Sequence, residues 1–132
     1  MTDDQEFIDA LPWDTTELNI SCRGLDKMPD LSRLTHLKSL DCSSNYITSL
    51  GTLSDTITDI YCSNNNLITI PPLGKNVRKM VCSKNKLTSI PPFNDSLEEF
   101  YCFNNYLTWI PPFNSSMKSF NCSCNMIKII PE

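Results

Sequence analysis

The sequence predicts a repeat solenoid of the α/β class whose regular structure is mostly β. Three observations lead to this fold class: five of the seven cysteines recur every twenty residues, an apolar pattern recurs with them, and nine prolines stand against only three glycines. A unit this short cannot bury its apolar side alone, so consecutive units have to stack. We therefore expect a parallel β-sheet on the concave face, an extended polyproline-II convex side and a short N-terminal capping helix.

The repeat unit explains these elements one by one. Aligned on Cys42, Cys62, Cys82, Cys102 and Cys122, five units share the pattern L-x-x-L-x-C-x-x-N-x-L-x-x-I, and Pro-Pro follows three of them. Residues around each cysteine should alternate between inside and outside, as in a short strand. The asparagine turns the chain away from the sheet, and its amide can satisfy backbone groups in the bend. The proline pair then fixes an extended return segment.

The first repeat is irregular, and its register has to be chosen. Placing Cys22 in the cysteine slot would put Leu25 in the asparagine slot. A shift of two residues instead places Leu18, Ile20 and Leu25 in apolar slots and Arg23 in the asparagine slot, with Cys22 on the open face. The return segment 30–37 lacks a proline pair and has room for a helical turn. We predict an N-terminal cap over residues 1–14 and a domain of about six repeats over 15–132.

A solenoid exposes its core at both ends unless something covers them. At the N-terminus, Thr2-x-x-Gln5 resembles a capping box that opens a helix through about Leu11, and Pro12 ends this helix. The apolar residues placed to cover the first coil are Phe7, Ile8, Leu11 and Trp13.

At the C-terminus the last coil is barely complete, and four apolar side chains would face nothing: Met117, Phe120, Cys122 and Ile127. An uncovered edge strand invites pairing with another chain, so a homodimer through the C-terminal repeat is one expectation. The alternative is that Pro131 and the charged terminus protect this end sufficiently.

The outward side chains of the predicted strands vary, whereas the inward rows are monotonous. In the middle coils the outward positions gather aromatic and apolar groups with charges around them, which is the anatomy of a protein-binding hot spot. The candidate protein-binding residues are Tyr61, Lys79, Val81, Lys84, Glu99, Tyr101 and Phe103. The alternative is that strand faces favour Tyr and Val through cross-strand packing alone.

Composition and motifs give no indication of catalysis, a metal site or a cofactor. The single histidine, His36, has no nucleophile or carboxylate partner at a suitable spacing, and the sequence has no glycine-rich phosphate loop. A net charge of −4 argues against nucleic-acid binding. No apolar stretch approaches the roughly 18 residues of a membrane span, and the acidic first segment argues against a secretory signal.

The recurring cysteines are explained most simply as small apolar core residues. Neither a Cys-x-x-Cys motif nor a histidine accompanies them, so disulfide pairing or a soft metal is the weaker alternative. Cys22 and Cys124 should be exposed and incidental. So many reduced thiols indicate an intracellular, cytoplasmic location, including the cytoplasm of a host cell, with a virion as the alternative.

Units such as residues 90–105, Ile-Pro-Pro-Phe-Asn-Asp-Ser-Leu-Glu-Glu-Phe-Tyr-Cys-Phe-Asn-Asn, resemble the short leucine-rich repeats of secreted bacterial effectors. The cysteine in place of a leucine is also similar to repeat proteins of large DNA viruses of amoebae. The resemblance covers about residues 15–131 and implies an arc that binds proteins inside a host or infected cell. Some such effectors carry a separate ubiquitin-ligase domain with a catalytic cysteine. We do not expect that activity here, because the sequence ends before any such domain.

Two functions follow from these observations. The first is a non-catalytic protein–protein interaction module that binds a partner, such as a host protein, through the concave strand face. The alternative is a structural or assembly protein that self-associates through its uncapped C-terminal end. Dependence of molecular size on concentration would separate the two.

Overall fold

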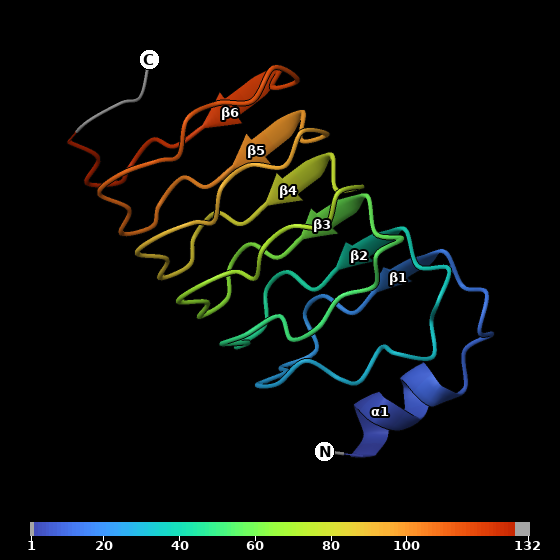
Figure 1. Cartoon of the computed structure of the whole chain (residues 1–132). Helices are drawn as coiled ribbons and strands as arrows, with labels where there is room; N and C mark the ends of the chain where they lie inside the picture. The colour runs from blue at the N-terminus through green and yellow to red at the C-terminus, as the bar shows by residue number, and fades with distance from the viewer. Residues whose placement is uncertain (1, 129–132) are drawn as a thin grey trace.

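The structure, a computed structural model, describes residues 2–128 as coils stacked along one axis, with a helix at the N-terminal end (Figure 1). Helix α1 spans Thr2–Asp9. The strands that follow are β1 (Glu17–Asn19), β2 (Ser39–Asp41), β3 (Asp59–Tyr61), β4 (Lys79–Val81), β5 (Glu99–Tyr101) and β6 (Ser119–Asn121). Each coil contributes one strand, so the same surface of every coil lies on one side of the molecule.

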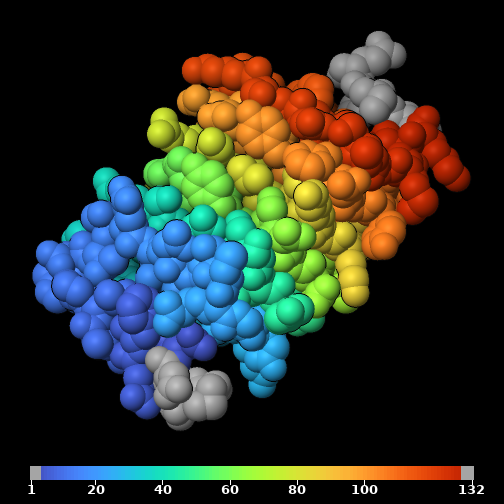
Figure 2. All heavy atoms as spheres, turned by 180° about the vertical axis from the view of Figure 1, so that it is seen from behind, coloured from blue at the N-terminus to red at the C-terminus, as the bar shows by residue number. Residues whose placement is uncertain are grey.

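The strands form a single parallel sheet in chain order, from β1 to β6. Leu40 pairs with Ile60 and Ile60 with Met80, so the register advances by one coil at each step. In β2 to β5 the central residue is buried and its two neighbours are partly exposed, as strand alternation requires. Consecutive coils accordingly form consecutive bands across the molecular surface (Figure 2). The predicted solenoid with a parallel sheet is confirmed.

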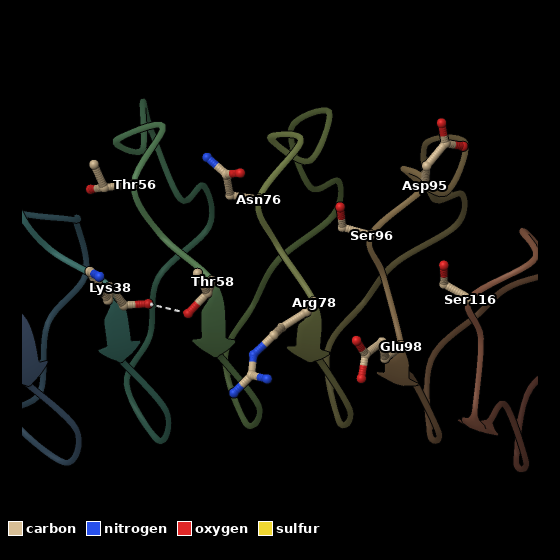
Figure 3. Close-up of a pocket in the computed structure, with 9 residues that line it drawn as sticks. All are labelled: Lys38, Thr56, Thr58, Asn76, Arg78, Asp95, Ser96, Glu98 and Ser116. Carbon is tan, nitrogen blue, oxygen red and sulfur yellow. Dashed lines mark hydrogen bonds between the residues drawn. The ribbon is translucent and has the colours of Figure 1, made fainter.

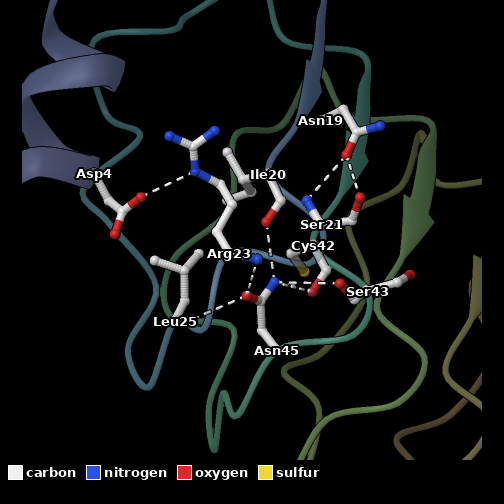
Figure 4. Close-up of polar contacts among 9 residues, drawn as sticks. All are labelled: Asp4, Asn19, Ile20, Ser21, Arg23, Leu25, Cys42, Ser43 and Asn45. Atoms are coloured by element: carbon white, nitrogen blue, oxygen red, sulfur yellow. Dashed lines mark hydrogen bonds and ion pairs between the residues drawn. The ribbon is translucent and has the colours of Figure 1, made fainter.

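The pairing of β1 with β2 also confirms the shifted register of the first repeat, because Leu18 lies opposite Leu40. Ile20 is buried in the slot that cysteine fills elsewhere, and Cys22 is exposed. The side chain of Arg23 turns towards the helix, where its Nε donates to Asp4 Oδ1 at 2.9 Å (Figure 4). The asparagine slot of the first repeat is therefore used to hold the cap.

A ladder of asparagine side chains joins the coils in the turn after each strand. Asn45 Oδ1 accepts the backbone N–H groups of Arg23 and Leu25 from the preceding coil, and its Nδ2 donates to the carbonyls of Ile20 and Cys42 (Figure 4). The other members of the ladder are Asn65, Asn85, Asn105 and Asn125. Each amide takes the place of water for backbone groups that the bend leaves without partners.

The residue before each ladder position has a left-handed backbone. These residues, with φ between 56° and 60°, are Cys22, Ser44, Asn64, Lys84, Asn104 and Cys124. The N–H of Ser44 donates to the Ser63 carbonyl at 2.9 Å, and the N–H of Lys84 donates to the Phe103 carbonyl at 2.9 Å. Residues other than glycine rarely adopt this conformation. Here it allows the hydrogen bonding between coils to continue beyond the end of the strand.

Helix α1 docks through polar contacts that the sequence analysis did not predict. Gln5 does not close a capping box, because its Oε1 accepts the Asp30 N–H at 2.8 Å and its Nε2 donates to the Asp30 carbonyl at 3.0 Å. The guanidinium of Arg33 donates to the carbonyls of Ile8 and Leu11 at 3.1 and 3.0 Å. These contacts fix the helix to the first coil and satisfy carbonyls at its C-terminal end.

The predicted apolar cover is only half correct. Ile8 is fully buried and Leu11 packs against the core, whereas Phe7 and Trp13 are 38% and 58% exposed. Phe7 lies under the Arg23 guanidinium, 4.5 Å from its carbon to the ring centre. Trp13 meets the ring of His36 edge-on at 4.9 Å.

The return segments run extended across the far side of the stack from the strands. Segment 30–37 contains two hydrogen-bonded turns, from Leu31 to Leu34 and from Leu34 to Leu37, and no helix. In the last two coils four rings fill the space between returns and sheet, with neighbouring centres 4.9–6.2 Å apart: Phe93, Phe100, Phe113 and Phe120.

The apolar residues of the last coil, Met117, Phe120, Cys122 and Ile127, are partly buried against the core. Their equivalents one coil earlier are almost fully buried, as the 1% exposure of Phe100 illustrates. The predicted roles of Ile130, Pro131 and the charged terminus lie outside the described residues. Dimerisation through this repeat stays a prediction.

Candidate protein-interaction face

The outward side chains of the sheet form what we call the strand face. It consists of the first and third residues of β1 to β6 and the outward side chains of the turn that follows each strand. All seven predicted binding residues lie on the coils of β3, β4 and β5. Tyr61 pairs with Val81 and Val81 with Tyr101, so these three side chains form one row across β3, β4 and β5. Lys79 pairs with Glu99 in the parallel row. The fold therefore brings together residues that are up to 42 positions apart in the chain.

Lys79 is the electrostatic centre of this group. Its Nζ lies 5.3 Å from the centre of the Tyr61 ring and 3.9 Å from Glu99 Oε1. Partial burial lowers the pKa of Lys79, but the neighbouring Tyr61 and Glu99 outweigh it and leave the pKa above its ordinary value. The ammonium therefore lies between an aromatic face and a carboxylate, and both favour its charged form.

The Tyr101 hydroxyl is also held in place. It donates to Glu99 Oε1 at 3.0 Å and hydrogen-bonds with the Ser119 hydroxyl at 2.8 Å, which ties β5 to β6. The ring itself is partly exposed on the strand face. Tyr101 thus presents an oriented apolar surface together with a polar tip.

Phe103 and Lys84 lie at the rim of the group, in the turns after β5 and β4. The Phe103 N–H donates to Ser83 Oγ at 3.1 Å. Ser83 is only 1% exposed, whereas the equivalent residues Ser43 and Ser63 are partly exposed, so the Phe103 residue covers it. Lys84 is exposed in its left-handed turn.

The N-terminal half of the strand face carries a feature that sequence reasoning missed. A shallow hollow over β1, β2 and β3 is lined by Glu17, Asn19, Ser39, Asp41 and Tyr61. Within residues 2–128, neither Glu17 nor Asp41 forms an ion pair, while Asp59 Oδ1 lies 3.5 Å from Arg78 Nε. The strand face is therefore acidic at this end and mixed in charge at its middle.

A wide hollow of about 650 Å³ lies on the flank where the chain enters the strands (Figure 3). One row of lining residues comes from four successive coils: Lys38, Thr58, Arg78 and Glu98. A second row beside it is short and polar: Thr56, Asn76, Ser96 and Ser116. The charges of Lys38 and Arg78 are balanced by Asp95 and Glu98, so the flank has no net charge that would select a ligand.

The buried cysteines of successive coils, which we call the cysteine ladder, have low reactivity. Cys42, Cys62, Cys82 and Cys102 are buried as free thiols, and burial raises the pKa of Cys42 and Cys102 to about 12. Burial also raises the pKa of Cys62 and Cys82 well above its ordinary value. Because the thiolate is the reactive form, these residues act as small apolar side chains.

Among the described residues, no group of three or more His, Cys, Asp or Glu side chains is arranged to hold a metal ion. Over the same part of the chain, the helix is too short and too polar to cross a membrane. Other exposed aromatic residues, Tyr46, Tyr106, Trp109 and Phe113, lie outside the strand positions and were not singled out by the sequence analysis.

Comparison with known proteins agrees with this geometry. Residues 36–59 match the family model of the Leucine Rich Repeat. The chain is also similar to the structure of YopM from Yersinia enterocolitica WA-314, with a TM-score of 0.88 and 28% sequence identity over 94% of this chain. The chain has the leucine-rich-repeat fold. No curated protein matches it by sequence.

Two further leucine-rich-repeat structures support the assignment. YopM, a leucine-rich effector protein from Yersinia pestis, gives a TM-score of 0.86 at 27% identity over 96% of this chain. A Shigella effector leucine-rich-repeat domain gives 0.85 at 24% identity over 89% of this chain, which shows the fold alone. The predicted resemblance to bacterial effector repeats is confirmed, while the viral one stays a prediction.

The leucine-rich-repeat chain spans only part of these relatives. It covers 28% of the Yersinia enterocolitica protein, 35% of the Yersinia pestis protein and 53% of the Shigella domain. Activities and partners of the whole relatives are therefore not transferred to this chain.

Proposed function

We propose that this chain is a non-catalytic protein-interaction module whose partner binds the middle of the strand face. The observation that carries the proposal is the row of Tyr61, Val81 and Tyr101 in register on three adjacent strands, partly exposed and with a charged pair beside it. A leucine-rich-repeat fold supports protein interaction in general. In this row the outward strand side chains are apolar or aromatic, whereas most of the other outward strand side chains are polar.

The preorganisation of the row favours binding. Tyr61 is held by Lys79 above its ring, and Tyr101 is held by Glu99 and Ser119. Side chains already fixed lose less conformational entropy when a partner arrives, so more of the contact energy appears as affinity. Because Lys79 and Glu99 already form an ion pair with each other, we expect apolar contacts to provide most of the binding free energy.

The interface should be small. Six strands about 4.8 Å apart span roughly 24 Å of sheet, and the apolar row occupies the middle three. A partner that covers this area fits the lower end of the usual interface size range. We further propose an intracellular location, in the cytoplasm and including that of a host cell, because all seven cysteines are free thiols.

Affinity capture from the source cells tests the proposal with matched tyrosine variants. Tyr61→Ala and Tyr101→Ala should each weaken capture of the partner at least tenfold, as truncation of hot-spot residues does. Tyr46→Ala is the control, because Tyr46 is 64% exposed and lies outside the strand face. Capture that is lost only with Tyr46→Ala would contradict the proposed face.

The alternative function, self-association through the C-terminal repeat, is favoured by one observation. Phe120 and Cys122 are partly exposed, although the equivalent positions of the preceding coils are buried. Sedimentation velocity over a hundredfold concentration range tests it. A species that grows with concentration, and that Phe120→Glu returns to the monomer, would support assembly, and a constant monomer would exclude it.

A further inference from the structure

An apolar hollow of about 240 Å³ lies between two return segments in the middle of the solenoid, away from the strand face. Residues 51–55 form one wall and 71–74 the other. Its floor consists of Ile57, Ile60 and Val77, which are 1–3% exposed and belong to the central core. The hollow therefore opens from the surface directly onto core side chains.

The lining of the hollow is mainly apolar, and its polar side chains are those of Thr52, Ser54 and Asp55. The N–H of Ile57 donates to the Ser54 carbonyl and the N–H of Val77 to the Gly74 carbonyl, so both backbone donors beside the hollow are satisfied within their own coils. At the mouth, a side-chain carbon on Gly51 or Gly74 would meet no atom within 4 Å, so the entrance is open. A pocket lined mainly by aliphatic groups with satisfied donors favours an apolar occupant.

The chain itself shows what fills this position elsewhere. Two coils further on, forty residues along the sequence, Leu53 is replaced by Phe93, Ile60 by Phe100 and Leu73 by Phe113. There the Phe93 ring centre lies 5.2 Å from that of Phe100 and 6.2 Å from that of Phe113. An aromatic ring thus occupies the space between the return segments in the last coils, and the aliphatic residues of the middle coils leave it vacant.

We propose that this hollow is a binding site for a small apolar molecule the size of a single aromatic ring. A cavity of about 150 Å³ lined by aliphatic and aromatic side chains is known to take up benzene, and 240 Å³ is larger than this. The ligand would contact Leu53, Leu73 and the buried floor, in place of the ring that the later coils supply from their own sequence. The proposal is independent of the partner proposed for the strand face.

Toluene is a suitable probe, titrated into the full chain and followed by methyl resonances in NMR. Ring-current shifts should appear at the methyl groups of Leu53, Ile57 and Val77, saturate with one dissociation constant, and leave the methyl groups of the last coil unmoved. Toluene at ten times its dissociation constant should also raise the melting temperature by a few degrees, because it binds only the folded state.

Variants that place a ring in the hollow give the decisive comparison. Leu53→Phe copies Phe93 and should abolish the saturable shifts, while Ile68→Phe adds the same ring at a side chain that is 54% exposed and should change nothing. Leu73→Phe, which copies Phe113, serves if Leu53→Phe does not fold. Shifts spread over methyl groups throughout the protein, or unchanged binding to a folded ring-bearing variant, would overturn the proposal.

Discussion

The asparagine ladder gives the sharpest quantitative prediction, and Asn85 is the member at its centre. Asn85 Nδ2 donates to the carbonyls of Cys62 and Cys82 at 3.1 Å each, and Oδ1 accepts the Leu67 N–H at 3.0 Å. Asn85→Ala removes these bonds, together with the one from Nδ2 to the Ser83 carbonyl at 3.2 Å, and leaves the Leu67 N–H in an apolar region without an acceptor. An unsatisfied buried donor costs about 1–3 kcal/mol, its own lost bond included, and loss of the Nδ2 bonds to the carbonyls adds roughly 1 kcal/mol in all. The expected loss is therefore about 2–4 kcal/mol of unfolding free energy.

Urea unfolding followed by circular dichroism measures this loss. With a typical slope of roughly 1–3 kcal/mol per molar urea, the midpoint should fall by about 1–2 M without a change of slope. Asn125 makes the equivalent bonds to Cys102, Cys122 and Leu107 but is only partly buried, so Asn125→Ala should cost about half as much. Equal effects at Asn85 and Asn125, or a loss below about 0.5 kcal/mol at Asn85, would refute the assignment of the energy to buried hydrogen bonds.

Four further predictions follow from the same structure. Iodoacetamide at pH 8 should modify the exposed Cys22 and Cys124 first, and mass spectrometry should find the buried ladder thiols unmodified until the protein unfolds. Because burial raises the pKa of Cys42 and Cys102 from 9.0 to about 12, their contribution to stability is complete below pH 9 and should decline as the pH rises from 9 towards 12, which alkaline melting curves would measure. Ser44→Gly should raise the unfolding free energy by up to about 1 kcal/mol, because Ser44 has φ 57° and glycine adopts that backbone without strain. Arg33→Ala should lower the unfolding free energy by about 1–3 kcal/mol in urea titrations, since it deletes both bonds to the helix carbonyls, and an unchanged midpoint would show that the cap does not depend on them.

The periodic part of the fold could be predicted from the sequence because periodicity is a local property. The twenty-residue spacing determines which residues lie opposite each other, and the pairing of Leu18 with Leu40 follows from apolar slots alone. The left-handed residue before each asparagine gave no such signal, since serine, lysine, asparagine and cysteine all occupy the position. Cys124 in the last described coil has φ 57° as well, so the conformation belongs to the turn that the following asparagine closes and does not depend on residue type.

The cap was predicted less well because its contacts are not periodic. Gln5 fits a capping-box spacing, yet its amide pairs with the backbone of Asp30, twenty-five residues away. A side chain of this length can reach either partner, and tertiary packing of the helix decides between them. The middle of the strand face was predictable for the opposite reason, because strand register brings Tyr61, Val81 and Tyr101 together directly. The acidic end of the face depends on which carboxylates remain without a cation, which requires the side-chain positions.

The alternation of the strands separates stability from recognition in this molecule, though not completely. Inward residues and ladder asparagines hold the coils, so substitutions at Tyr61 or Val81 should change affinity while the fold is retained. Tyr101 is different, because its hydroxyl also bonds Ser119 on the next strand. A loss of binding with Tyr101→Ala therefore combines a lost contact with a loosened β6, whereas Tyr101→Phe loses the same hydroxyl bonds but keeps the ring. If the apolar row carries the binding energy, Tyr101→Phe should bind almost as well as the unaltered chain, and Tyr61→Ala should account for the larger loss.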